Sequence, residues 1–366
     1  MHLYIHVPFC ARRCSYCDFS IAIRRVVPSD AFVDAVLVDW NQQLQTEPLT
    51  RATTLDTLYF GGGTPSHVAP SAIHRLIEAV QTDRPLVEGA EVTLEANPDD
   101  VTPEAARTWR AAGINRISLG VQSFDPAVLQ WMHRVHAADA PARAIDDLRE
   151  AGFEDISVDL IFALPAGLLR DWSRDLDLAL ALRPTHLSLY GLTVENGTPL
   201  GRWTARGEAI VAPDESYAEE YLAAHAAFAA AGFEHYEVSN AALPGHRARH
   251  NSAYWSRRPF VGLGPSAHSG AGDRRWWNVR EWAAYERMAG RGEPLIAGSE
   301  QLDGEALRLE SLYLGLRTVD GLEADLLPAE TRRRWCDLAW ATETAGRLRL
   351  TAEGWLRLDA LVAAVA

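Results

Sequence analysis

Three cysteines near the N-terminus have the spacing of ligands for a metal group. Cys10, Cys14 and Cys17 form a CxxxCxxC pattern, whereas the fourth cysteine, Cys336, lies near the end of the chain. Three thiolates hold three irons of a 4Fe–4S cube and leave the fourth iron open, while an electron-transfer ferredoxin normally supplies four cysteines. The spacing therefore predicts a 4Fe–4S cluster with one open iron. A zinc site completed by His6 is the alternative that the thiols alone leave open.

An open iron would give such a cluster further chemistry. It can chelate the amino and carboxylate groups of S-adenosylmethionine, and electron transfer from the cluster then cleaves the sulfonium to give a 5′-deoxyadenosyl radical. This chemistry requires an electron donor for the cluster. It also requires polar groups that hold the nucleoside and the amino-acid end of the cofactor.

Short β runs alternate with helical segments through the first two-thirds of the chain. We expect strands at 3–7, 55–60, 91–95, 114–119, 156–162 and 186–190, and helices at 31–44, 71–80, 103–112, 126–132, 138–151, 169–182 and 214–231. Ser29 and Asp30 are the cap candidates for the first helix. Repeated βα units imply a parallel sheet with right-handed crossovers. The pattern predicts an α/β protein built on a partial, TIM-like (β/α)6 barrel.

Glycines and polar residues gather at the carboxyl ends of these predicted strands. Ligands bind there in parallel α/β barrels because the loops converge. The cysteine loop follows the first strand, and the later strands carry or end in Gly61-Gly62-Gly63-Thr64, Glu95-Ala96-Asn97-Pro98, Gly120-Val121-Gln122-Ser123, Asp159 and Tyr190-Gly191-Leu192-Thr193. These loops therefore predict one shared site.

The last third of the chain differs in composition. Residues 233–300 are rich in His, Trp, Gly and Asn and have a weak helical pattern, whereas residues 301–366 are expected to form a small α+β module. In that module we expect helices at 305–316, 329–344 and 351–365 and a strand at 347–350. The sequence thus predicts three parts: a barrel over 1–232, a His/Trp/Gly-rich ligand segment over 233–300 and a C-terminal domain over 301–366.

Composition argues against several classes of function. The net charge of −14 disfavours a nucleic-acid partner, which usually needs a basic face. The chain has no lysine, the residue that pyridoxal-phosphate enzymes and P-loop nucleotide sites require. No apolar run is long enough for a transmembrane helix, and the N-terminus lacks the layout of a signal peptide. We therefore expect a cytoplasmic protein.

The combined motifs resemble radical S-adenosylmethionine (radical SAM) proteins of the oxygen-independent coproporphyrinogen III oxidase family. The resemblance rests on YxHxPFCxxxCxYC at residues 4–17 and on GGGTPS, EANP, GVQS, SVDLIFALP, HYEVSN and GLGPSAHS, and it covers nearly the whole chain. It implies that Cys10, Cys14 and Cys17 bind the cluster. It also implies cofactor-binding roles for Tyr4, Tyr16, Gly62, Gly63, Thr64, Glu95, Gln122, Arg134, Asp159, Thr193 and His268. A plain turn at the glycines, a surface position for Arg134 and a structural pairing for Asp159 remain alternatives.

Within this family, three features resemble a branch of haem chaperones more than the true oxidases. Phe19 stands where those oxidases have a further cysteine, the sequence starts only nine residues before its first cluster cysteine, and HNSAYW at 250–255 matches an HNxxYW motif of the haem-binding branch. The resemblance implies a protein that binds haem and transfers it to a recipient haemoprotein, with respiratory proteins as candidates. The alternatives are a coproporphyrinogen III oxidase and a radical SAM enzyme for another small molecule.

The resemblance also suggests how haem would be held. His250 is expected to ligate the haem iron, because imidazole is a common axial ligand. A hydrogen-bonded structural role is the alternative for His250, and His268 is the rival ligand, with His235 and His246 as weaker candidates. Stacking by Tyr254 and Trp255 and pairing of Arg247 and Arg249 with propionates complete this expectation. We further expect slow cleavage of S-adenosylmethionine without conversion of coproporphyrinogen III. A homodimer is also possible on this sequence.

Overall fold

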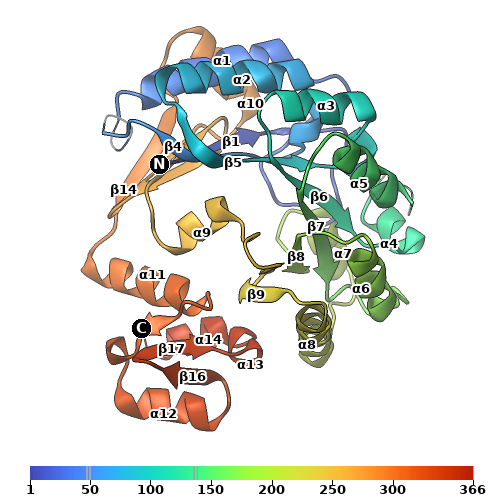
Figure 1. Cartoon of the computed structure of the whole chain (residues 1–366), viewed down its shortest axis with the longest axis vertical. Coiled ribbons are helices and arrows are strands. Elements are labelled where there is room, and N and C mark those ends of the chain that lie inside the picture. Colours follow the sequence, from blue (N-terminus) through green and yellow to red (C-terminus); the bar gives the residue numbers. More distant parts are fainter. Residues whose placement is uncertain (47, 49–50, 135–136, 138, 366) are drawn as a thin grey trace.

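The computed structural model describes residues 1–46, 48, 51–134, 137 and 139–365. At its centre, parallel strands follow one another in chain order (Figure 1): β1 (His2–Val7), β4 (Leu55–Gly62), β5 (Leu86–Ala96), β6 (Arg116–Gln122), β7 (Asp155–Phe162) and β8 (His186–Gly191). Each predicted β run is thus a strand of this sheet. The expected α/β class and partial (β/α)6 barrel are confirmed.

Helices cover the outer face of the parallel strands (Figure 1). They are α1 (Ser29–Gln43), α2 (Pro70–Asp83), α3 (Pro103–Ala111), α4 (Pro126–Trp131), α5 (Ala140–Glu150), α6 (Trp172–Ala181) and α8 (Asp214–Ala230). The short helix α7 (Pro199–Ala205) instead packs beside the cysteine loop, where the Leu200 backbone N–H donates to the carbonyl oxygen of Ser15. The first residue expected in the helix at 138–151 lies outside the described residues. Among the described helices, none has the length and apolar character that a membrane crossing requires.

Two helix starts differ in how their first backbone amides are capped. Thr102 caps α3, because its side chain accepts a hydrogen bond from the backbone N–H of Ala105. The expected side-chain cap of α1 is wrong: the helix already includes Ser29, and no side-chain cap bond is present. Ser29 instead accepts a hydrogen bond from the backbone N–H of Ala69. Its hydroxyl therefore holds the loop before α2 rather than its own helix.

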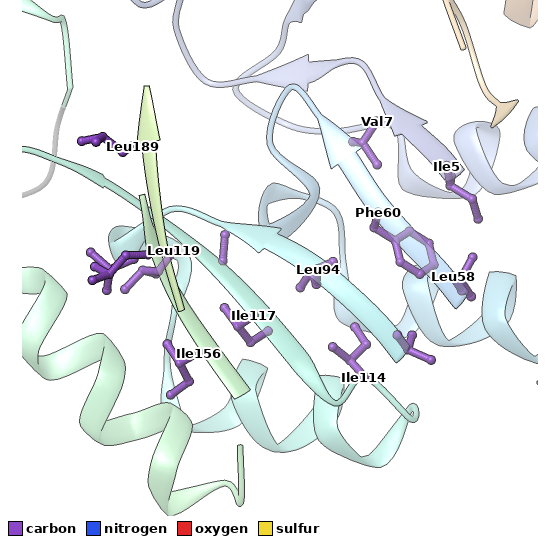
Figure 2. Packing of buried hydrophobic residues seen from close by; sticks show 14 of the residues in the cluster. Ile5, Val7, Leu58, Phe60, Leu94, Ile114, Ile117, Leu119, Ile156 and Leu189 are labelled. Atoms are coloured by element: carbon purple, nitrogen blue, oxygen red, sulfur yellow. The ribbon is translucent and has the colours of Figure 1, made fainter. Parts of the chain in front are cut away.

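The alternation of side chains along the strands separates the core from the barrel interior. In β1, Leu3, Ile5 and Val7 are fully buried in the main hydrophobic cluster. Figure 2 shows Ile5 and Val7 beside Leu58 and Phe60 of β4, within the apolar layer that continues along the sheet. Successive residues of a strand point to opposite faces. Polar side chains of β1 such as Tyr4 therefore face the barrel interior, where the site lies.

The His/Trp/Gly-rich segment adds strands to both edges of the same sheet. One wing consists of β10 (Asn240–Ala242) and β9 (Glu234–Glu237) beside β8, and the other of β11 (Phe260–Leu263), β12 (His268–Ala271), β13 (Arg274–Asn278) and β14 (Ile296–Gln301) beside β1. The segment also contains α9 (Arg249–Trp255) and α10 (Trp282–Gly290). Apart from β11, which runs parallel to β1, the wing strands pair antiparallel. The weak helical pattern therefore reflects short strands around two short helices.

The C-terminal part is the expected small α+β unit, although two of its predicted helices are wrong in extent. It contains α11 (Gly304–Leu316), β15 (Leu322–Glu323), α12 (Ala329–Asp337), β16 (Ala341–Thr344), β17 (Arg347–Leu350), α13 (Ala352–Trp355) and α14 (Leu358–Ala363). The helix expected at 329–344 ends early because residues 341–344 pair with β17 as a hairpin. The helix expected at 351–365 is two short helices. Arg357, with a φ of −117°, separates them.

Candidate functional site

The loops after the parallel strands enclose a cavity of about 490 Å³, which we call the strand-end cavity. Most of the predicted site residues line it: Cys10, Cys14, Tyr16, Cys17, Gly62, Gly63, Thr64, Glu95, Gln122, Arg134, Asp159 and Thr193. Tyr4 and His268 line a neighbouring cavity instead. The structure therefore brings together, at one end of the barrel, residues that lie between Cys10 and Thr193 in the sequence.

The cysteine loop opens directly onto the strand-end cavity. All three cysteines are free thiols, and Thr64 donates a hydrogen bond to the Cys10 sulfur at 3.4 Å. Burial raises the pKa of the Cys10 thiol to about 11. A metal ligand must be deprotonated, so iron binding would have to displace a firmly held proton. The residue after the second cysteine, Ser15, is tied by its backbone N–H to the carbonyl of Met132 at 3.2 Å.

The zinc alternative receives no support from the geometry. The ring nitrogens of His6 lie 3.1 Å from the Tyr4 hydroxyl and 3.3 Å from the carbonyl oxygen of Ser20. Among the described residues, no three His, Cys, Asp or Glu side chains converge on one ion. A cube of iron and sulfur instead needs one thiolate at each of three corners. The donor set thus fits a cluster better than a mononuclear zinc site.

Two glycines at the end of β4 allow the backbone to approach the cysteine loop closely. Gly62 has a φ of +110°, and a Cβ there would lie 2.5 Å from the His6 ring. A Cβ at Gly63 would lie 2.8 Å from the carbonyl oxygen of Phe9. Larger residues are therefore excluded by close contact at both positions and by backbone conformation at Gly62. The plain-turn alternative does not account for this tight approach beneath the cavity.

Glu95 faces the cavity from the end of β5. Its two carboxylate oxygens accept hydrogen bonds from the Tyr59 hydroxyl at 2.8 Å and from the Gly62 backbone N–H at 3.0 Å. Burial, together with the negative charge of Asp159, raises the pKa of Glu95 to about 7, although these two hydrogen-bond donors act in the opposite direction. A cationic or hydroxyl-bearing ligand beside Glu95 would favour the ionised carboxylate.

Asp159 sits among serine hydroxyls from three neighbouring strands. Ser118 donates to its two carboxylate oxygens at 3.0 and 3.1 Å, and Ser157 donates at 3.3 Å. Burial raises the pKa of Asp159, while hydrogen bonds from Ser188, Ser118 and Ser157 oppose that shift. These serines were not identified from the sequence. Their signal was present, since each is a small polar residue between two apolar neighbours in its strand.

Gln122 and Arg134 leave polar atoms without protein partners beside the same cavity. Gln122 has a φ of +70°, and its buried amide oxygen has no hydrogen-bond partner. Arg134 donates to the carbonyl oxygen of Gly120, whereas its buried Nε atom has no partner among the residues that the structure describes. Unpartnered buried polar atoms are uncommon and indicate an additional binding partner. Arg134 is therefore not a surface residue, and both side chains fit a polar ligand.

A second cavity of about 610 Å³, here called the outer cavity, adjoins the first. Asp18, Phe19, Gly62 and Glu95 line both. The remaining wall comes from β1, α9, the strands β11 to β13 and α11, and it includes Tyr4, Tyr254, Trp255, Arg257, Arg258, Phe260, His268, Arg275, Arg280 and Glu310. Aromatic and cationic side chains therefore share one space.

The arginines of the outer cavity divide into two pairs. Arg257 and Arg275 both form ion pairs with Glu310 of α11, at 2.7 and 2.6 Å. The side chains of Arg258 and Arg280 line the cavity and have no protein partner within the described part of the chain. Two positive charges are thus available to an anionic ligand. Arg280 was not identified from the sequence, because it lies 22 residues beyond Arg258 with no motif around it.

His250 lies inside the barrel and lines neither cavity. Its Nδ1 atom is 2.7 Å from the Thr57 hydroxyl, and its Nε2 atom is 2.7 Å from the Tyr254 hydroxyl. The ring also stacks on Tyr59 with a centroid distance of 5.0 Å. Burial lowers the pKa of His250 to about 3. Both nitrogens are therefore occupied in this structure, as the structural alternative requires.

The other predicted haem contacts lie in different places. His268 is exposed in the outer cavity, 5.9 Å from the Trp277 ring. Arg247 instead pairs with Glu234 at 2.6 Å, and Arg249 donates to the carbonyl oxygen of Gly89 at 2.6 Å. Neither of these two arginines lines the strand-end cavity or the outer cavity. The expected pairing of Arg247 and Arg249 with propionates is therefore not what this geometry favours.

Comparisons with known proteins agree with this site. The Radical SAM superfamily matches residues 4–179. A Mycobacterium tuberculosis protein named "Heme chaperone HemW" is 39% identical over 98% of this chain and 93% of its own length, and a Bacillus subtilis protein of the same name is 34% identical over 87% and 84%. The mitochondrial radical S-adenosyl methionine domain-containing protein 1 of Bos taurus is 35% identical over 87% of this chain and 74% of its own.

A solved structure shows that the likeness extends to the fold. The coproporphyrinogen III oxidase HemN from Escherichia coli superposes with a TM-score of 0.80 and 21% identity, over 99% of this chain and 88% of its own. Together with the cysteine loop and the strand-end cavity, these matches define a radical SAM protein. The chain belongs to the HemW family within that superfamily. Membership of the superfamily implies a 4Fe–4S cluster and S-adenosylmethionine.

Proposed function

We propose that this protein is a haem chaperone, which binds haem in the outer cavity and transfers it to recipient haemoproteins, respiratory ones included. Relatives at up to 39% identity over 98% of the chain carry that function in their names. The observation that carries the proposal is the outer cavity itself. Its volume is within the range of small-molecule sites, and aromatic side chains line it beside unpaired arginines.

The walls of the outer cavity suit a flat molecule with two carboxylates. Trp255 and Phe260 offer apolar surface to a macrocycle. Arg258 and Arg280 are free to pair with two propionates by charge-assisted hydrogen bonds. His268, which faces the same space, is the accessible imidazole for the iron.

Ligation of the iron by His250 stays a prediction, and it would require a rearrangement of the neighbouring side chain. The Tyr254 hydroxyl occupies Nε2 of His250, and Tyr254 itself lines the outer cavity. Haem could reach that nitrogen only after the tyrosine ring had moved aside. The proposal therefore places His268 ahead of His250 as the ligand of the resting protein.

The strand-end cavity would serve the iron–sulfur cofactor. Cys10, Cys14 and Cys17 would hold a 4Fe–4S cluster, and Gly62, Gly63 and Thr64 would receive the amino-acid end of S-adenosylmethionine. Glu95, Gln122, Arg134 and Asp159 would hydrogen-bond its polar groups, with Tyr4, Tyr16 and Thr193 at the margins. When bound, the cluster and S-adenosylmethionine supply a 5′-deoxyadenosyl radical. Gln122 and Arg134 support this assignment, because each offers a buried polar atom without a protein partner.

One observation favours a radical enzyme acting on a tetrapyrrole or another small molecule as the second candidate. The two cavities share Phe19 and Glu95, so a ligand in the outer cavity would lie next to the cofactor. Oxygen-independent oxidation of coproporphyrinogen III would use that proximity. Phe19, at the position of the additional cysteine in the oxidases that resemble this chain, argues against it.

The remaining partners and the location are proposals of the same kind. An electron donor for the cluster follows from the expected cofactor chemistry, and a cytoplasmic location follows from the composition, while the sequence leaves a homodimer open. Because the net charge of −14 disfavours nucleic-acid binding, we propose no nucleic-acid partner.

Haem titration of anaerobically reconstituted protein tests the function directly. We expect saturable binding with a shifted Soret band, followed by transfer of the haem to an apo-haemoprotein such as apomyoglobin. A parallel incubation with coproporphyrinogen III, S-adenosylmethionine and dithionite should give no protoporphyrinogen IX. Conversion of coproporphyrinogen III together with failure to bind haem would replace the chaperone with the oxidase.

A further inference from the structure

The HYEVSN motif at residues 235–240 has no part in the function proposed so far, although one of its side chains connects to the strand-end cavity. Tyr236 is 2% exposed and lies on β9, outside the six parallel strands. Its hydroxyl is 2.9 Å from Nε2 of His186 on β8. The other ring nitrogen of His186, Nδ1, is 2.7 Å from the hydroxyl of Ser157 on β7. Ser157 in turn donates to Asp159 at 3.3 Å.

One backbone amide fixes the direction of this hydrogen-bonded chain. The N–H of Ala248, the residue before α9, donates to the Tyr236 hydroxyl oxygen at 3.2 Å. An amide can only donate, so it must use a lone pair of that oxygen. Among the described residues the hydroxyl has one other partner, His186. If the oxygen accepted from His186 as well, the buried hydroxyl proton would have no partner among the described residues, so the Tyr236 proton points to Nε2 of His186.

The same logic carries through the histidine to the carboxylate. Burial lowers the pKa of His186 well below its usual value, so the ring is neutral and carries one proton. With Nε2 as an acceptor, that proton sits on Nδ1 and is donated to Ser157. The Ser157 hydroxyl then has its own proton for either Asp159 or the Ser188 hydroxyl, each 3.3 Å away, and a carboxylate is the stronger acceptor. Four groups, from the Ala248 amide to Ser157, thus donate in the same direction.

We propose that Tyr236, His186 and Ser157 are positioning residues that hold the Asp159 carboxylate, as a hydrogen-bond acceptor, in the orientation that binds S-adenosylmethionine. The proposal rests on the role of Asp159 in the proposed function and extends it to three residues that line neither cavity. Without Tyr236 as a donor, His186 is free to take the other tautomer. Ser157 must then donate to the ring, and Asp159 loses one of its serine donors.

This series of hydrogen bonds also links β9 to a site that the parallel strands build. β9 lies at the edge of the sheet beyond β10 and β8. Tyr236 of β9 contacts His186 of β8, and His186 contacts Ser157 of β7, because Ser157 and His186 are direct neighbours in the strand register. Asp159 and Ser188 are the next such pair toward the carboxyl end of the strands.

Replacing Tyr236 by phenylalanine tests the proposal, because it removes one hydroxyl and keeps the ring. We expect the affinity of the cluster-loaded protein for S-adenosylmethionine, measured by calorimetry, to fall about threefold to tenfold, the loss typical of one hydrogen bond. Tyr221→Phe is the matched control. Tyr221 is 3% exposed and donates to the carbonyl oxygen of Val238, outside the chain of hydrogen bonds. Its variant should bind with the affinity of the unmodified protein.

Nitrogen chemical shifts of labelled histidine supply a readout that a merely structural role would not move. His186, assigned by its absence in His186→Gln, should show the Nδ1–H tautomer in the unmodified protein and lose that preference in Tyr236→Phe. An Nε2–H tautomer in the unmodified protein overturns the relay even if the variant folds poorly. Weakened binding in Asp159→Asn with unchanged binding in Tyr236→Phe also overturns it. Unchanged binding in Asp159→Asn would instead refute the role of Asp159, while haem binding would remain a separate measurement.

Discussion

The two adjoining cavities are built in different ways. The strand-end cavity takes its residues from loops that follow consecutive parallel strands, each next to its neighbour in the sheet. The outer cavity takes its residues from β1, from α9 and the wing strands, and from α11 of the C-terminal part. Motifs that follow parallel strands therefore indicate one site from the sequence alone. Residues that meet only through the wings and the last domain carry no such signal.

This difference predicts that the two cavities respond separately to mutation. Polar contacts in the strand-end cavity include three donors on Asp159 and two on Glu95, so its side chains are held in place before any ligand arrives. In the outer cavity, Arg258, Arg280 and His268 are free of hydrogen-bonded side-chain partners within the described residues. We expect the first site to be specific and rigid and the second to be adaptable. The following measurements test that separation.

Loss of the cluster should be the largest effect. Alanine at Cys10, Cys14 and Cys17 should abolish the roughly four irons and four sulfides per chain that a 4Fe–4S cluster contains, because each thiolate holds one iron. Iron and acid-labile sulfide analysis of anaerobic protein measures this. Cys336→Ala is the matched control and should keep a full complement. Haem binding that disappears with the cluster would show that the cavities are not independent.

Replacement of His268 and replacement of His250 should have different effects on haem binding. His268→Ala should shift the Soret band or weaken binding, since it removes the exposed imidazole of the outer cavity, whereas the other imidazole that lines it, His6, is buried. His250→Ala should leave the spectrum unchanged and lower the free energy of unfolding by about 2–3 kcal/mol, because the Thr57 and Tyr254 hydroxyls would lose a buried partner. A spectral change in His250→Ala alone would restore His250 as the iron ligand.

The free arginines should govern haem affinity without affecting the cofactor. Charge-assisted hydrogen bonds to carboxylates are worth about 1.5–3 kcal/mol when well formed, and exposure reduces that value. The double change Arg258→Ala and Arg280→Ala should therefore weaken haem binding about tenfold or more and leave S-adenosylmethionine affinity unchanged. Equilibrium titrations with each ligand give both numbers. Equal losses for haem and S-adenosylmethionine would contradict two separate sites.

Binding of S-adenosylmethionine should strengthen as pH rises through neutrality. Burial raises the pKa of Glu95 from 4.5 to about 7, so its carboxyl is largely neutral below that pH and charged above it. We expect severalfold tighter binding at about pH 8 than at about pH 6, and a smaller pH dependence in Glu95→Gln. Without ligand, the free energy of unfolding should fall as pH rises from about 4.5 to about 7, since the folded state keeps a proton that the unfolded state releases.

The smallest effect is expected at Arg247. Its guanidinium pairs with Glu234 and lines neither cavity, so Arg247→Ala should change haem affinity less than about twofold. The same titration measures this. A loss as large as that of the Arg258 and Arg280 pair would return the propionate site to the neighbourhood of Arg247. It would also break the assignment of haem to the outer cavity.

Local patterns predicted the barrel well and the last third poorly. The strands of the barrel are set by near neighbours in the chain, so sequence alone was sufficient there, although the cap expected for α1 was wrong. The sequence predicted residues 341–344 as the end of a helix, whereas their pairing with β17 makes them a strand. Residues 233–300 gave no clear periodicity, because short strands at both edges of a sheet depend on the strands that receive them.

The sequence by itself determined the chemistry at the strand ends. Parallel strands bring their carboxyl ends together. A repeat of six βα units therefore places the cysteine loop, the glycines at the end of β4 and the carboxylates Glu95 and Asp159 at one site. The tertiary structure decided the rest. It buried His250 between two hydroxyls and exposed His268. It also brought Arg280 and Arg258 to one cavity and connected Tyr236 to Asp159 through His186. These contacts join residues that are distant in the chain, and only packing determines which distant side chains meet.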